Sequence, residues 1–325
     1  MGARTLRRER LVSAAIRLSV LIPAFNESES LPVLHRELVQ VLEKLGQPWE
    51  IVYVDDGSRD GTDRVIAGLA AGDRRVRGAS LRRNFGKSAA LATGFRLVRG
   101  EWVATMDADL QDDPGELPRM IEALEGGLDL VSGWKRNRQD PLSKTVPSRL
   151  FNAVTSIVAG VRLHDFNCGF KIYRREVTDA LDVYGELHRF MPALAHWRGF
   201  RVGELPVHHR PRRFGRSKFG AARFVNGFLD LMAAAFISTS ALKPLHVFGR
   251  IGLAFLGVGV LIGAWFVAQW LGGEPMRVRP IMLFGAGLVM VGLQFILMGL
   301  LGEMIAAMGA RSEYPVRGRY NLDAP

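Results

Sequence analysis

The chain has 325 residues, enough for one large or two ordinary domains, and carries a formal net charge of +11. That charge calls for an anionic partner, such as nucleic acid, an anionic lipid surface or a phosphorylated substrate. The single cysteine, Cys168, excludes an internal disulfide and suits a reducing compartment. The basic stretch at residues 1–16 lacks the apolar core of a signal peptide, so we expect the amino-terminal domain to be cytoplasmic.

Predicted strands and helices alternate through the first 131 residues. The strands are expected at residues 18–22, 49–54, 76–81, 102–106 and 128–131, and the helices at 31–45, 62–71, 86–99 and 118–124. This alternation predicts a doubly wound α/β fold with a mostly parallel sheet. No Gly-x-Gly-x-x-Gly motif follows the first strand, which argues against an NAD-type site.

Acidic residues follow three of the predicted strands. They are Glu27, Asp55, Asp56, Asp107 and Asp109. The carboxyl ends of strands in an open α/β sheet face the crevice where ligands bind. Asp107 and Asp109 are two residues apart, so in extended geometry they point the same way and suit a divalent cation that shares its shell with phosphates. Each acidic residue alone is as well explained by a turn or a cap, but together they favour a nucleotide diphosphate site, to which Lys87 at a helix start adds positive charge.

The last third of the chain is strongly apolar. Residues 221–245 predict one or two amphipathic helices in the membrane interface, with an ordinary core helix as the alternative. Residues 251–271 and 281–301 carry no charge, and at ~1.5 Å per residue each spans the ~30 Å hydrocarbon core. The short link between them predicts a transmembrane hairpin whose ends share one side.

Charge and small residues refine this picture of the hairpin. The basic tail at 311–325 fits the cytoplasmic side, whereas Arg277 and Arg279 in the hairpin loop conflict with the positive-inside tendency. Glycines along both spans favour close helix packing and would permit a homo-oligomer.

Five motifs together resemble the family 2 glycosyltransferases of GT-A fold. They are Pro23-Ala-Phe-Asn-Glu27, Asp55-Asp-Gly-Ser58, Asn84-Phe-Gly-Lys87, Asp107-Ala-Asp-Leu-Gln-Asp112 and Arg212-Arg-Phe-Gly-Arg-Ser-Lys218. The last motif and the helix pair resemble the polyisoprenyl-phosphate branch, which includes dolichol-phosphate mannose synthase and bacterial undecaprenyl-phosphate glucosyltransferases. The likeness covers about residues 17–310. The Gln-x-x-Arg-Trp motif of processive synthases is absent, Phe25 stands where many relatives have Tyr, and Asp112-Asp-Pro114 departs from a His-Pro-Pro form.

The resemblance implies an architecture and a reaction. The architecture is a Rossmann-like GT-A domain at 17–220, interfacial helices at 221–245, a transmembrane hairpin at 246–310 and a cytoplasmic tail at 311–325. The reaction is inverting transfer of one sugar from a nucleotide diphosphate sugar, of UDP-glucose or GDP-mannose type, to undecaprenyl or dolichyl phosphate. It would use Mg²⁺ or Mn²⁺ at the cytoplasmic face of the inner membrane.

The resemblance also implies roles for individual residues. The donor would contact Pro23, Phe25, Glu27, Asp55, Asp56, Lys87, Asp107 and Ala108. The metal would be held by Asp107, Asp109 and Gln111. The catalytic set would comprise Asp109, Asp165, Arg136, Arg212 and Lys218. The acceptor phosphate would be bound by Arg138, Lys144, Ser148, Arg149 and Ser217.

The chemistry of a lipid phosphate is consistent with an acceptor site made of basic residues. A lipid phosphate has a second pKa of ~6 and is largely dianionic at neutral pH, so it needs orientation more than a general base. Asp165 is the candidate if a base exists, with structural capping as the equal alternative. The basic residues would otherwise form a solvated face or attract anionic lipid.

Three other functions remain open or are set aside. The same fold with the hairpin as a simple anchor would act on a soluble or protein acceptor. A scaffold would bind nucleotide sugars without turnover. Nucleic-acid binding explains the charge but neither the acidic crevice nor the apolar helix pair, so we expect no nucleic-acid partner.

Overall fold

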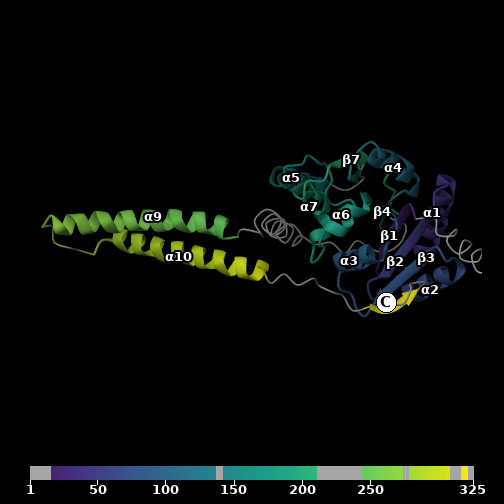
Figure 1. Cartoon of the computed structure of the whole chain (residues 1–325), viewed down its shortest axis with the longest axis horizontal. Helices are drawn as coiled ribbons and strands as arrows, with labels where there is room; N and C mark the ends of the chain where they lie inside the picture. Colours follow the sequence, from purple (N-terminus) through teal and green to yellow (C-terminus); the bar gives the residue numbers. More distant parts are fainter. Residues whose placement is uncertain are drawn as a thin grey trace, which may run out of the picture. The chain divides into compact units, whose positions relative to one another are not determined.

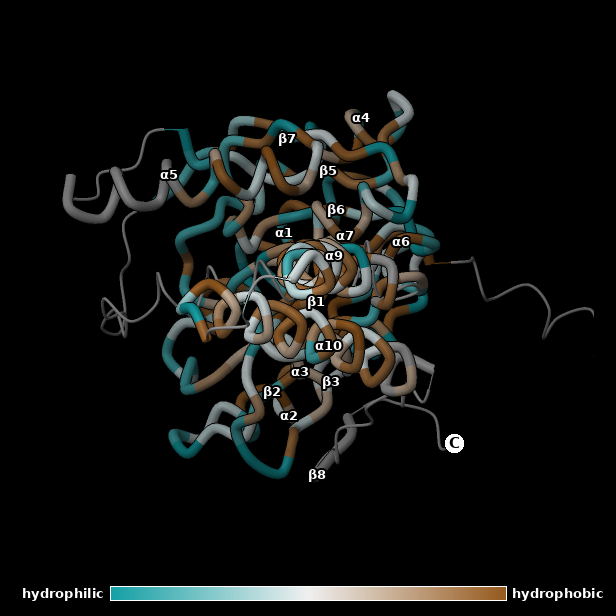
Figure 2. The backbone as a smooth tube through the Cα atoms, turned by 90° about the vertical axis from the view of Figure 1, so that its left-hand side faces the viewer, coloured by the Kyte–Doolittle hydropathy of each residue, from teal (hydrophilic) through white to brown (hydrophobic). Residues whose placement is uncertain are grey.

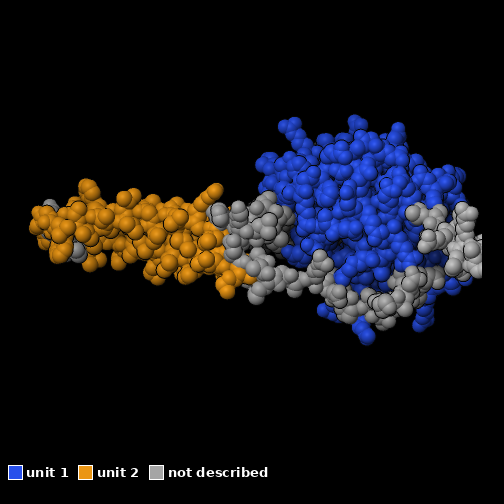
Figure 3. All heavy atoms as spheres, in the orientation of Figure 1, with its two compact units in different colours: residues 1–231, 312–325 blue, residues 232–311 orange. Residues whose placement is uncertain are grey.

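The computed structural model describes residues 16–136, 142–210, 244–273, 275, 278–307 and 316–320. The chain divides into two compact units, residues 1–231 with 312–325 and residues 232–311 (Figure 3). Most of the predicted interfacial segment, residues 221–243, lies outside the described residues, so that assignment stays a prediction.

An eight-stranded, mostly parallel sheet forms the centre of the larger unit (Figure 1), in the order β7-β5-β6-β4-β1-β2-β3-β8. The strands are β1 Leu18–Ala24, β2 Trp49–Asp55, β3 Val76–Leu81, β4 Trp102–Thr105, β5 Leu130–Trp134, β6 Lys171–Arg174, β7 Val202–Pro206 and β8 Val316–Tyr320. The strands β4, β1, β2 and β3 run parallel, and β6 pairs antiparallel with both β4 and β5. The predicted α/β fold is confirmed.

Helices follow the strands of this sheet. They are α1 Leu31–Leu45, α2 Thr62–Gly72, α3 Lys87–Leu97, α4 Leu117–Glu125, α5 Leu142–Ala159, α6 Arg175–Ala180 and α7 Met191–Trp197, with short 3₁₀ turns at Pro114–Glu116 and Leu187–Arg189. The leucine stripe of α1 is buried, and the helix stops at Gly46, whose φ of 63° only glycine adopts readily. The elements predicted up to residue 131 are all present, although β5 starts two residues later than expected.

The smaller unit is a pair of apolar helices, α9 Pro244–Leu271 and α10 Pro280–Ala307. Hydrophobic residues recur along both helices (Figure 2), and each has a stretch long and apolar enough to cross a membrane. Glycine lets the two backbones touch, because a Cβ on Gly252 would lie 2.6 Å from the Gly292 carbonyl oxygen. Gly259 approaches Gly285 equally closely. Small residues therefore serve packing within the hairpin, and a homo-oligomer stays a prediction.

The carboxy-terminal segment contains a strand that the sequence analysis did not predict. β8 pairs antiparallel with β3, where Ala79 lies opposite Arg319. The chain thus leaves the larger unit, forms the hairpin and returns to the sheet of the larger unit.

Candidate functional site

The carboxyl ends of β1, β2 and β4 meet at one edge of the sheet, because these strands are parallel neighbours. Pro23 lies near the end of β1, and Ala24 is in register with Asp55. The loop after β1 is fixed to the loop after β2, since the Asn26 amide donates to Ser58 Oγ at 2.8 Å and the Glu27 amide to Thr62 Oγ1 at 2.9 Å. The structure therefore brings the predicted donor residues of both loops together.

The adjacent residues Asp55 and Asp56 have different surroundings. Asp55 is fully buried, and its Oδ1 accepts from the Ser58 amide at 3.0 Å. Its Oδ2 is buried without a hydrogen-bond partner among the described residues. Both oxygens of Asp56 accept from backbone amides, those of Phe85 and Gly86, at 2.8 Å each. Asp55 therefore retains an acceptor for a ligand, whereas Asp56 holds the loop before α3, and its donor contact stays a prediction.

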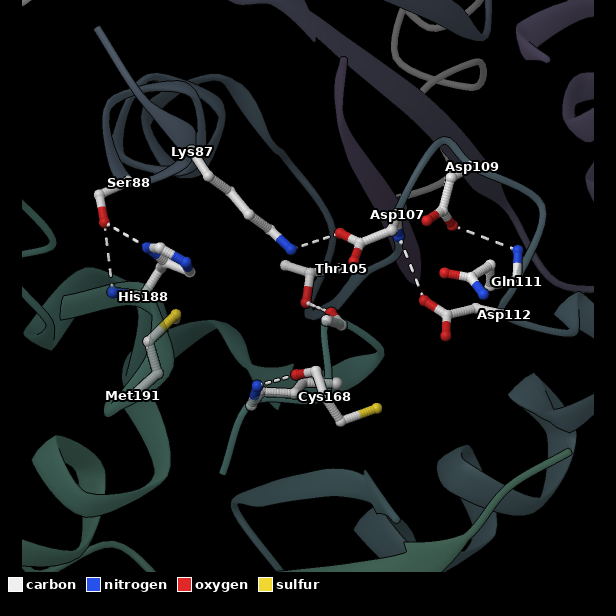
Figure 4. Close-up of polar contacts among 12 residues, drawn as sticks. Lys87, Ser88, Thr105, Asp107, Asp109, Gln111, Asp112, Cys168, His188 and Met191 are labelled. Carbon is white, nitrogen blue, oxygen red and sulfur yellow. Dashed lines mark hydrogen bonds and ion pairs between the residues drawn. The ribbon is translucent and has the colours of Figure 1, made fainter. Parts of the chain in front are cut away.

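The metal motif lies in a turn after β4. The prediction that Asp107 and Asp109 share one extended segment is wrong, because β4 ends at Thr105 and Leu110 has a φ of 63°. Asp107 forms an ion pair with Lys87 from the start of α3, and Asp109 accepts from the Gln111 amide at 3.2 Å (Figure 4). Ala108 between them is buried. A tight turn, rather than a strand, presents the two carboxylates.

Close backbone approach positions Asp107. A Cβ on Gly169 would lie 2.4 Å from Asp107 Oδ2, so only glycine fits beside this carboxylate. Burial alone would raise the pKa of Asp107, but the cations of Lys87 and Lys135 outweigh it and lower the value to about 2. Asp107 is therefore ionised throughout the physiological range.

These residues fit a divalent cation. The described residues contain no group of three or more His, Cys, Asp or Glu that could hold a metal alone. Asp107 and Asp109 nevertheless supply two hard oxygen donors, and the Asp107 side chain, 29% exposed, already meets a cation. Mg²⁺ and similar ions commonly bind one or two carboxylates and complete their shell with substrate phosphates and water.

The basic segment before residue 211 is attached to the metal motif. The Arg210 amide donates to the Gln111 carbonyl at 2.8 Å, and Asp112 forms a β-bridge with His209. The Arg210 guanidinium pairs with Glu37 at 2.6 Å and Asp113 at 2.8 Å. Arg212, Ser217 and Lys218 follow directly in the chain, outside the described residues.

The structure describes only part of the predicted acceptor site. Arg136 is exposed, with its guanidinium 5.7 Å from the centre of the Trp134 ring. Lys144, Ser148 and Arg149 belong to α5, whose side chains are described only from residue 151, and Arg138 lies outside the described residues. Buried Asp165 accepts from the Asn167 amide at 3.0 Å, as capping predicts. A role as base stays a prediction.

Two lysines of the site, Lys135 and Lys171, were missed by the sequence analysis. The Lys135 side chain is 11% exposed and pairs with Asp112 at 3.1 Å. Partial burial would lower the pKa of Lys135, but Asp112 and other nearby anions raise it. Lys171 is buried at the start of β6. The His188 ring bonds Ser88 Oγ at 2.9 Å, and burial followed by the charge of Lys87 lowers its pKa well below 6.5, which leaves the ring neutral. Low exposure, which nothing in the local pattern reveals, distinguishes Lys135 and Lys171.

Cys168 takes no part in this chemistry. Its side chain is fully buried, and burial raises the pKa of the thiol to about 12. That position is typical of a cysteine that serves packing.

Comparison with known proteins gives matches over both units. Residues 19–182 match the model of glycosyl transferase family 2, and residues 243–308 match that of the GtrB C-terminal hairpin. Dodecaprenyl-phosphate galacturonate synthase of Rhizobium johnstonii is 37% identical over 308 residues, which cover 90% of this chain and 88% of that protein. Undecaprenyl-phosphate 4-deoxy-4-formamido-L-arabinose transferase of Pseudomonas fluorescens is 37% identical over 311 residues, with 94% and 89% covered.

Solved structures share the fold of the larger unit. Glucosyl-3-phosphoglycerate synthase from Mycobacterium tuberculosis, in complex with Mn²⁺, UDP and phosphoglyceric acid, aligns with a TM-score of 0.55 over 70% of this chain and 80% of that one. The sequence identity is 17%, so this likeness supports the fold alone.

Proposed function

Because this chain belongs to glycosyl transferase family 2, we propose that it transfers one sugar from a nucleotide diphosphate sugar to a polyprenyl phosphate at a membrane surface. The observation that carries the proposal is the set of carboxylates at the ends of β1, β2 and β4, in a chain that also holds an apolar hairpin. The two relatives at 37% identity are named for transfer to dodecaprenyl and undecaprenyl phosphate.

The donor would lie across the edge formed by β1, β2 and β4. Asp55 Oδ2, buried and without a described partner, is suited to accept a hydrogen bond from a nucleobase N–H or a ribose hydroxyl. Pro23, Phe25 and Glu27 would border the same end of the nucleotide. Asp107, Asp109 and Gln111 would hold a divalent cation, Mg²⁺ or Mn²⁺. Such an ion would neutralise the charge on the departing nucleoside diphosphate.

The acceptor phosphate would be held by cationic side chains and would attack the anomeric carbon directly. Arg136 offers a bidentate guanidinium for this task, together with Arg138, Lys144, Ser148 and Arg149. Arg212, Ser217 and Lys218 would approach from the segment that Arg210 fixes to the metal motif. Inversion at the anomeric carbon follows from a single displacement.

The path of the chain supports a single side for the hairpin ends and the catalytic unit. β8 pairs with β3, and only eight residues, 308–315, separate it from α10. The nine Cα–Cα steps from Ala307 to Val316 span at most about 32 Å, less than the ~40 Å of a bilayer with its headgroups. The catalytic unit and both ends of the hairpin would therefore share the cytoplasmic side of the inner membrane.

The test uses purified full-length protein, undecaprenyl phosphate, Mg²⁺ or Mn²⁺ and a panel of radiolabelled nucleotide sugars. We expect label from one donor to enter the organic phase, and EDTA or Asp109→Ala to abolish this. Transfer to a water-soluble acceptor instead would show that the hairpin is only an anchor. Donor binding without transfer to any acceptor would identify a scaffold and overturn the proposal.

A further inference from the structure

The outer face of α10 carries a polar side chain, Gln294, deep inside an apolar span. The span covers Pro280–Gly302, so Gln294 lies about 12 Å from its nearer end at ~1.5 Å per residue. Gly292, two residues earlier, contacts α9; at about 100° per residue Gln294 lies on the opposite side of the helix, where it is exposed. Lipid tails offer an amide no hydrogen bond, so Gln294 is costly there unless another protein group meets it.

The residues in line with Gln294 form a stripe with the spacing of a coiled coil. Its members recur at alternating intervals of four and three residues and are Leu283, Gly287, Met290, Gln294, Leu297 and Leu301. The four large apolar members are each more than half exposed. A Cβ on Gly287 would meet nothing within 4 Å, so packing against α9 does not require this glycine. A single polar residue in such a repeat commonly fixes the register and the partner of the helix.

A second copy of the chain meets the chemical needs of this stripe. A side-chain amide both donates and accepts, so Gln294 of one copy can bond Gln294 of another. Both copies enter the membrane in the same orientation, so their α10 helices are parallel and a two-fold interface brings equal residues together at equal depth. Gly287, seven residues earlier on the same face, allows the two backbones to approach closely, as small residues do in lipid.

We propose that the stripe of α10 is the contact between two copies of the chain and that paired Gln294 amides fix its register. The inference requires the hairpin to cross a bilayer, as in the proposed function, but it does not depend on which sugar is transferred. Each hairpin packs internally through the opposite face of α10, so the two contacts can form together.

The experiment uses single cysteines on α10 of the full-length protein in a Cys168→Ser background. Membranes are treated with an oxidant, and disulfide-linked dimer is measured on non-reducing gels. Met290→Cys and Leu297→Cys lie on the stripe, whereas the matched controls Phe284→Cys and Leu300→Cys are also exposed but lie about a quarter turn to either side. We expect the two stripe positions to give at least about threefold more dimer than the two controls.

Variants of Gln294 test the role of the amide in the Met290→Cys background. Gln294→Met keeps the length of the side chain but removes its hydrogen bonds, and should lower the dimer yield about threefold to tenfold, whereas Gln294→Asn should retain most of it. Gln269→Met is the matched control, because Gln269 lies two residues from the end of its span, where water and headgroups reach. Resistance to carbonate extraction verifies that each variant remains in the membrane.

Several outcomes would overturn the inference. Equal yields at the four cysteine positions would mean that the stripe makes no specific contact, and an unchanged yield in Gln294→Met would remove the role of the amide. Adducts with another protein in place of the dimer would identify a different partner. Absence of the dimer in membranes that still form the lipid-linked sugar would leave the proposed function standing, whereas release of the wild-type chain by carbonate would remove both.

Discussion

At the scale of single residues, the neighbouring Asp55 and Asp56 differ in their hydrogen bonds, and we expect them to differ in function. We predict that Asp55→Asn weakens donor binding about tenfold or more, because it removes charge from a buried acceptor that has no hydrogen-bond partner among the described residues. Asp56→Asn should instead lower the free energy of unfolding by about 2 kcal/mol, since one of two backbone amides loses its partner. Calorimetry with the donor and thermal melting separate the two effects. The reverse assignment would contradict this division of roles.

Lys171 predicts a dependence of stability on pH. Burial, the largest cause, lowers the pKa of this lysine from 10.5 to about 8. Between these values the unfolded chain holds the proton and the folded chain does not, so stability rises with pH. Relative to Lys171→Met, the wild type should gain roughly 3 kcal/mol between pH 8 and pH 10.5. Denaturant unfolding of both proteins across this range measures the difference, and parallel curves would show that the pKa of the lysine is the same in the folded and unfolded chains.

At the scale of elements, the sequence predicted the strands and helices more reliably than the site that they form. The spacing of apolar residues and the polar residues at the strand ends located β1 to β4 and their helices, because these elements depend on residues close together in the sequence. The position of Asp107 depends on close packing against Gly169, which is distant in the sequence. The surroundings of Lys171 likewise depend on its burial between distant segments. β8 has too few apolar residues to signal a strand, and its pairing with β3 is a contact between residues more than 230 apart in the chain.

The packing of the hairpin predicts different effects for two glycine substitutions, one inside the contact between α9 and α10 and one outside it. Gly252→Leu would place its side chain against the Gly292 backbone and cost about 1–3 kcal/mol, whereas a Cβ on Gly257 meets nothing within 4 Å. We expect the first variant to lower the apparent melting midpoint in detergent by several degrees, on the order of 2–10 °C, and Gly257→Leu to change it little. A comparable loss in both variants would show that Gly257 faces another surface, such as a second copy of the chain.

At the scale of the whole molecule, the return of the chain to its own sheet predicts a membrane topology. Because the link from α10 to β8 is too short to cross a bilayer with its headgroups, we predict that the carboxy-terminal tail and the catalytic unit share a side and that the hairpin loop lies on the other. This prediction does not depend on charge. It agrees with the basic tail and opposes the orientation that Arg277 and Arg279 would favour.

Single cysteines in a Cys168→Ser background test this topology with a membrane-impermeant maleimide. The positions are Glu125 on the catalytic unit, Pro275 in the hairpin loop and Asp323 in the tail. We expect the cysteines at 125 and 323 to react from the same side, in inverted vesicles but not in intact spheroplasts, and the cysteine at 275 to show the opposite pattern. Labelling of 323 together with 275 would mean that β8 cannot pair with its own sheet in the membrane. In that case the edge of β3 would be open to another strand, and the hairpin would have to be assigned a side by charge alone.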